Sequence, residues 1–175
     1  MVSLSELPDP IGDPSPRVVI LLDVDGVLNP KVVRDPSATG NTHRLVLSPS
    51  RAEVVRDLGS LGPIVWATTW ERGALHQLST DLGINMAGHV PMTRLDPDRR
   101  TPKLPAVQRW ISRMQATGDL TWDLLVWIDD NLGPDTDAWA AEQGNPTFLV
   151  RTDPRYGVRS SDAHAIRQWS AAFKP

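Results

Sequence analysis

Short apolar runs alternate with helical patterns along most of the chain. The first run, Val18–Leu22, contains only apolar residues and predicts a strand buried on both faces. Later runs predict further strands, with stretches of helical periodicity between them. We expect strands at 18–22, 64–68, near 87–90, at 124–128 and at 147–150, and helices near 50–59, 72–82, 104–116, 135–143 and 161–173.

This alternation predicts an α/β protein: a three-layer, Rossmann-like fold with a central parallel sheet and helices on both faces. Residues 17–175 are expected to form a single domain, and the proline-rich segment 1–16 a flexible leader. Segment 29–49 is rich in turn-forming residues and predicts a short flap or hairpin after the first strand, with β-like pieces at 32–33 and 45–47.

Local signals mark helix ends. Ser50 and Glu53 have the spacing of a capping box at the start of the first helix. Glycines stand where three of the helices are expected to stop, because glycine readily adopts the left-handed conformation that closes a helix. These glycines are Gly83, Gly118 and Gly144.

Composition narrows the class of protein. With 175 residues, 40% of them hydrophobic, the chain can bury a sizeable core. The net charge of −3 gives no global positive field to attract nucleic acid or anionic lipid, although local basic patches remain open. The absence of cysteine excludes disulfides, thiolate metal sites and cysteine nucleophiles. Neither a membrane-spanning run nor a secretory signal is visible, so we expect a soluble, cytoplasmic protein.

Two carboxylates, Asp23 and Asp25, follow the first strand and are themselves followed by Gly26. In an extended strand, side chains at positions i and i+2 point the same way, so regular geometry would crowd two negative charges. A change of chain direction at Gly26, or a divalent cation between the carboxylates, would relieve the repulsion. The pattern therefore indicates a magnesium-assisted site rather than a solvated turn.

Other strands deliver polar groups to the same edge, where ligands bind in open α/β sheets. The second long strand ends at Thr68 and Thr69, whose hydroxyls can hold a phosphoryl oxygen. The fourth is followed by Asp129 and Asp130, and Lys103 opens the preceding helix. Singly, these residues have ordinary explanations as strand formers, a helix cap and a surface lysine. Together they favour a site.

This set resembles the haloacid dehalogenase superfamily of phosphohydrolases. Residues 23–28 resemble its first motif, Thr68 its second, Lys103 its third, and Asp129-Asp130 its fourth, in the expected order. The resemblance covers nearly all of residues 17–172. The sequence Thr-Thr-Trp at 68–70 differs from the usual threonine followed by glycine, which leaves open whether Thr68 or Thr69 contacts phosphate and whether Trp70 flanks the site or packs in the core.

The resemblance implies a role for each residue of the first motif. Asp23 would attack phosphorus to give an aspartyl-phosphate that water later hydrolyses. Asp25 would protonate the leaving oxygen and then deprotonate that water. Substrate phosphoryl oxygens would be bound by Thr68 or Thr69, Lys103 and the chain at Gly26.

The resemblance also implies Mg²⁺ as cofactor. Its ligands would be the Asp23 carboxylate, the Asp25 backbone carbonyl, and Asp129 or Asp130, with Asp129 favoured as the direct ligand because it comes first after the strand.

The expected reaction is phosphomonoester hydrolysis on a phosphorylated substrate. The motif spacing leaves no room for a cap domain, and lidless members are associated with bulky phosphoesters such as nucleic-acid ends or nucleotides. Two basic clusters could attract a polyanion, although solvated loops of mixed charge are the favoured interpretation; they are Lys31, Arg34, His43 and Arg44, and Arg94, Arg99, Arg100 and Lys103. The alternative function is a catalytically weak regulatory module that binds Mg²⁺ and phosphate. The order of motifs argues against a response-regulator receiver, and no P-loop is present.

Overall fold

The computed structural model describes residues 15–29, 47–93 and 95–173. Five strands and five helices alternate in this part of the chain, as the sequence predicts. They are β1 (Val18–Leu22), α1 (Pro49–Leu61), β2 (Ile64–Trp66), α2 (Arg72–Leu82), β3 (Met86–His89), α3 (Leu104–Thr117), β4 (Leu124–Asp129), α4 (Pro134–Ala141), β5 (Thr147–Arg151) and α5 (Ser160–Ala171).

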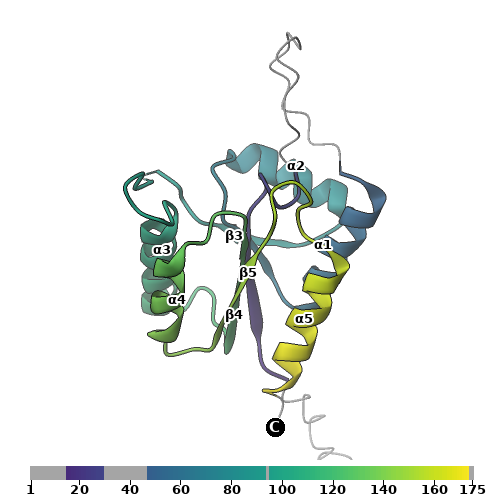
Figure 1. Cartoon of the computed structure of the whole chain (residues 1–175). Coiled ribbons are helices and arrows are strands. Elements are labelled where there is room, and N and C mark those ends of the chain that lie inside the picture. Colours follow the sequence, from purple (N-terminus) through teal and green to yellow (C-terminus); the bar gives the residue numbers. More distant parts are fainter. Residues whose placement is uncertain (1–14, 30–46, 94, 174–175) are drawn as a thin grey trace, which may run out of the picture.

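The strands form one parallel sheet in the order β3-β2-β1-β4-β5, with helices on both faces (Figure 1). Alternate side chains of the central strand β1 enter two separate cores. Ile20 and Leu22 pack in the cluster that includes residues of α1, α2 and α5, whereas Val19 and Leu21 pack in the cluster that includes residues of α3 and α4. The three-layer α/β architecture is therefore confirmed.

Several boundaries differ from the predictions. Strand β2 stops at Trp66, two residues early, because the chain turns at the edge of the sheet. The predicted capping box at Ser50 is wrong: Ser48 caps α1, its hydroxyl accepting from the Arg51 amide at 3.3 Å. Pro49, which has no N–H to lose, fills the first helical position.

Two of the three predicted helix-ending glycines are confirmed, since Gly83 and Gly118 cap α2 and α3 in the left-handed conformation. The prediction for Gly144 is wrong. Helix α4 ends at Ala141, and its last turn closes when the Glu142 amide donates to the carbonyls of Ala140 and Trp139. The chain has thus left the helix before it reaches Gly144.

Two predicted segments lie largely outside the described residues: most of the leader at 1–16, and the flap with its β-like pieces. The described residues contain no cap domain. No helix in this part of the chain is long and apolar enough to cross a membrane.

The loop after β5 is attached to the loop after β1. The Thr152 hydroxyl donates to the Gly26 carbonyl at 3.1 Å, and the Val158 amide donates to the Val27 carbonyl at 2.9 Å. Between them, Gly157 has a φ of +66°, and a Cβ placed there would lie 2.1 Å from the Val27 oxygen. Only glycine allows both this conformation and this approach.

We predict that Gly157→Ala destabilises the protein by more than the roughly 1–3 kcal/mol of a strained backbone conformation, because the added methyl also displaces the loop after β1. The matched control is Gly144→Ala, where a Cβ meets no atom within 4 Å and φ is not positive. Urea unfolding of both variants checks the prediction, and equal stabilities would contradict it.

Candidate active site

Three carboxylates converge at the carboxyl edge of the sheet. Asp23 directly follows β1, and Asp129 ends the neighbouring parallel strand β4, in which Ile128 pairs with Leu22. Asp23, Asp129 and Asp130 each offer one oxygen, and these oxygens lie within 4.8 Å of one another. Asp23 and Asp129 are buried, and Asp130 is half-buried. The structure thus brings together the three carboxylates that the sequence offers as metal ligands.

Lys103 lies against this cluster. Its Nζ is 2.6 Å from Asp23 Oδ2 and 2.8 Å from Asp129 Oδ2, and the side chain is only 14% exposed. Thr101 fixes the preceding loop, because its hydroxyl donates to Asp135 at 2.7 Å and accepts from the Gly133 amide at 2.7 Å. These bonds attach the start of α3 to the start of α4, and so hold the lysine over the end of β4.

Among the described residues, Lys103 is the cation that contacts both buried carboxylates of the cluster. Burial and, after it, the Asp129 charge raise the pKa of Asp23 to about 7, although Lys103 opposes the shift. Burial by itself would lower the pKa of Lys103, but Asp129 and Asp23 outweigh burial and hold it above its usual value. Lys103 brings one positive charge to the two buried carboxylates of Asp23 and Asp129, and a divalent cation at the cluster would further favour their ionised forms. Carboxylate oxygens in this number suit Mg²⁺.

Asp25 does not belong to the cluster. After Asp23 the chain turns sharply at Gly26, whose φ is +75°, and a Cβ at Gly26 would lie 2.3 Å from the Asp130 carboxyl group. The Asp25 carboxylate instead accepts from Asn29 Nδ2 at 3.1 Å and from the indole N–H of Trp70 at 2.9 Å. Trp70 therefore does both things that the sequence left open: it packs against the core and fixes a predicted catalytic side chain.

The two threonines differ in their surroundings. Thr68 is 3% exposed, and its hydroxyl has no hydrogen-bond partner among the described residues. Thr69 is exposed. A buried hydroxyl without a partner lowers stability, and a ligand oxygen would satisfy it. The geometry therefore favours Thr68 as the phosphate contact.

Sequence reasoning missed the supporting residues. Thr152 holds both neighbouring loops, since its amide donates to the Asp129 carbonyl and its hydroxyl to Gly26. The sequence signal that could have revealed Thr152 is its position directly after β5, at the carboxyl edge of the sheet. Among the predicted basic residues, Arg99 pairs with Asp96 at 3.2 Å, as the solvated-loop interpretation expects. Lys31, Arg34, His43, Arg44 and Arg94 lie outside the described residues.

Residues 19–163 match the family described as the HAD domain in Swiss Army Knife RNA repair proteins. The chain belongs to this family. It is thus a member of the haloacid dehalogenase (HAD) superfamily, as the motifs predicted. Comparisons with curated proteins and with solved structures gave no significant match. Membership indicates a hydrolase that acts on phosphate esters.

We predict that Lys103→Met destabilises the metal-free protein in a pH-dependent way. Because the pKa of Asp23 is raised to about 7, the folded state binds a proton more tightly than the unfolded chain, and ionisation of Asp23 removes stability as pH rises from about 4 to about 7. Without Lys103 this loss deepens. We expect Lys103→Met to lower the free energy of unfolding by about 3 kcal/mol at pH 8, and by less at pH 5, where Asp23 is protonated.

Urea unfolding with EDTA at the two pH values tests this. Arg113→Met, on the exposed face of α3, is the control and should change stability little at either pH. An equal loss for Lys103→Met at both values would show that lost packing, not lost charge, is responsible.

Proposed function

We propose that this protein is a Mg²⁺-dependent phosphatase that removes a terminal phosphate from nucleic acid through an aspartyl-phosphate on Asp23. The observation that carries the proposal is the placement of Asp23: buried at the end of β1, within reach of Asp129 and Asp130, and in contact with Lys103. A nucleophile beside a cation site and a fixed ammonium is the arrangement that phosphoryl transfer requires.

The proposed reaction has two steps, formation and hydrolysis of the aspartyl-phosphate. A carboxylate oxygen of Asp23 attacks phosphorus, and the ester oxygen leaves with a proton from Asp25. Water then attacks the aspartyl-phosphate while Asp25 takes its proton, which releases phosphate and restores Asp23. Thr68 and Lys103 donate hydrogen bonds to the equatorial oxygens, where negative charge develops.

The carboxylates of Asp23 and of Asp129 or Asp130, with the Asp25 carbonyl, would hold Mg²⁺, which when bound offsets phosphoryl charge. Asp129 is expected to be the direct ligand, with Asp130 in support. Trp70 and Asn29 keep Asp25 in position by donating to its two oxygens.

The family description supports a nucleic-acid substrate. The family is described from RNA repair proteins, whose substrates are polynucleotides. The alternative, a module that binds Mg²⁺ and phosphate without turnover, differs in one measurable respect: it would release no phosphate.

We predict Mg²⁺-dependent phosphate release that Asp23→Asn abolishes, because an amide is a poor nucleophile and a weaker metal ligand. A panel of phosphorylated RNA and DNA ends, nucleotides, sugar phosphates and p-nitrophenyl phosphate should show the highest kcat/KM for a nucleic-acid end. Asp119→Asn, at an exposed carboxylate, is the control. Turnover that survives in Asp23→Asn would refute the nucleophile assignment, and binding without turnover in the wild type would establish the regulatory alternative.

The matched pair Thr68→Val and Thr69→Val separates the two threonines. Thr68→Val should lower kcat/KM by roughly 100-fold, the size of effect typical for loss of one donor to developing charge. The same variant should raise the melting temperature of the ligand-free protein, because a methyl group replaces a buried hydroxyl without a partner. Thr69→Val should do neither. Reversed effects would assign the phosphate contact to Thr69.

A further inference from the structure

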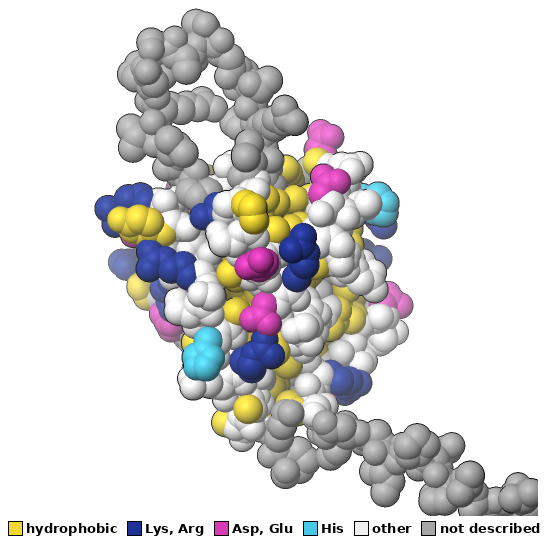
Figure 2. Space-filling model, turned by 90° about the vertical axis from the view of Figure 1, so that its right-hand side faces the viewer, with side chains coloured by type: hydrophobic (Ala, Val, Ile, Leu, Met, Phe, Trp, Pro, Cys, Tyr) yellow, Lys and Arg dark blue, Asp and Glu magenta, His cyan; other side chains and the backbone are white. Residues whose placement is uncertain are grey.

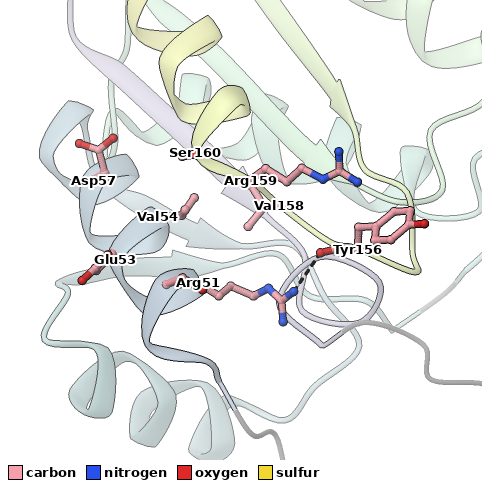
Figure 3. A pocket seen from close by; sticks show the side chains of 9 residues that line it. Arg51, Glu53, Val54, Asp57, Tyr156, Val158, Arg159 and Ser160 are labelled. Carbon is pink, nitrogen blue, oxygen red and sulfur yellow. Dashed lines mark hydrogen bonds between the residues drawn. The ribbon is translucent and has the colours of Figure 1, made fainter.

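A pocket of about 610 Å³ lies between α1 and the segment that leads into α5. It opens on the face shown in Figure 2, where acidic and basic side chains are interspersed. Figure 3 shows that the pocket itself is polarised. Arg51 and Arg159 extend toward Tyr156 at one end, and Glu53 and Asp57 lie at the other.

The basic end carries two guanidinium groups, Arg51 and Arg159, that form no ion pair with a described residue, although the Asp153 carboxylate interacts with the Arg159 charge. The Arg51 guanidinium donates to two backbone carbonyls, of Leu28 at 3.1 Å and of Tyr156 at 2.9 Å, and its Nε is buried without a partner in the described part of the chain. Burial lowers the pKa of Arg51, as expected when carbonyls rather than carboxylates surround a guanidinium. Arg159 is exposed and forms no ion pair with any described residue.

Tyr156 adds an aromatic surface to this charge. The residue is 53% exposed, so its ring is accessible to a ligand. The Arg159 guanidinium lies 4.7 Å from its ring centroid. At the acidic end of the pocket, the negative charge is partly offset because Asp57 forms an ion pair with Arg167. An anionic ligand with a flat ring would therefore be drawn to the Tyr156 end.

The pocket is connected to the catalytic loop. Arg51 holds the Leu28 carbonyl and Val158 holds the Val27 carbonyl, and both carbonyls belong to the turn that begins with Asp25. The close approach of Gly157 to Val27 makes this connection rigid. A strand seated in the pocket would thus lie in a fixed relation to the predicted catalytic groups.

We propose that the Tyr156 end of this pocket binds a nucleotide of a single-stranded nucleic acid, with a base stacked on Tyr156 and Arg159 in contact with a backbone phosphate. Arg51 contributes positive charge beneath them. This inference rests on the proposed function for the identity of the ligand, and it adds a recognition site separate from the reacting phosphate. Stacking on an exposed aromatic ring beside arginine is a common way to bind unpaired bases.

The test uses the full chain carrying Asp23→Asn, so that the substrate is bound and not consumed. Fluorescence anisotropy measures the Kd of a single-stranded RNA oligonucleotide with a terminal phosphate. Tyr156→Ala should raise Kd by about tenfold, within the range for loss of one stacked base, and Tyr156→Phe by less than about twofold because the ring is kept. Both variants retain the carbonyl that Arg51 contacts.

Arg159→Gln should also raise Kd and should flatten its dependence on salt, because one phosphate contact is lost. The matched control Arg113→Gln removes an equal charge from α3, on the opposite face of the sheet, and should change neither quantity. An unchanged Kd in Tyr156→Ala, or the same increase in Arg113→Gln as in Arg159→Gln, would overturn the proposal.

Catalytic measurements separate this inference from the proposed function. In the active protein, Tyr156→Ala should lower the ratio of kcat/KM for the oligonucleotide to that for p-nitrophenyl phosphate by about tenfold. An unchanged ratio with a working phosphatase would overturn the pocket assignment and leave the proposed function standing. Absence of any Asp23-dependent hydrolysis would overturn the proposed function, while the binding measurement would still decide the pocket.

Discussion

The contact of Lys103 with Asp23 and Asp129 is the interaction on which the rest of the site depends. Two carboxylates buried side by side at the ends of β1 and β4 would repel each other strongly in a medium with little water. A single ammonium that contacts both of them makes the arrangement possible. Asp130 lies beside these two carboxylates, and oxygens of all three residues lie close enough together to hold a metal ion.

The scaffold places this lysine through contacts that lie far apart in the sequence. Thr101 and Asp135 are separated by 34 positions, yet their hydrogen bond attaches the loop before α3 to the start of α4. Thr152 joins the loops after β1, β4 and β5 in the same way. Each threonine is buried and uses its hydroxyl inside the protein. The two residues therefore hold the loops of the carboxyl edge together without occupying the site.

Sequence alone predicted the elements and the candidate residues because both leave local signals. The apolar run of β1 reveals a buried strand, and a strand that ends in Asp23 must deliver that carboxylate to the edge of a parallel sheet. Local sequence signals failed where the structure depends on adjacent residues or on contacts between distant segments. Ser50 has the spacing of a cap, but Ser48 and Pro49 start the helix earlier. Likewise, no pattern could show that Trp70 would donate to Asp25, since that bond joins loops 45 positions apart.

Two close backbone approaches explain how the turn at the site can be well ordered without a ligand. Gly26 lets the Asp130 carboxyl group pack against the turn after β1, and Gly157 lets the loop after β5 reach the same turn from the other side. Because a turn held from both sides loses little further freedom when a ligand binds, the entropic cost of positioning Asp25 is met during folding. The order of this turn is thus built into the loops of the sheet edge before any ligand binds.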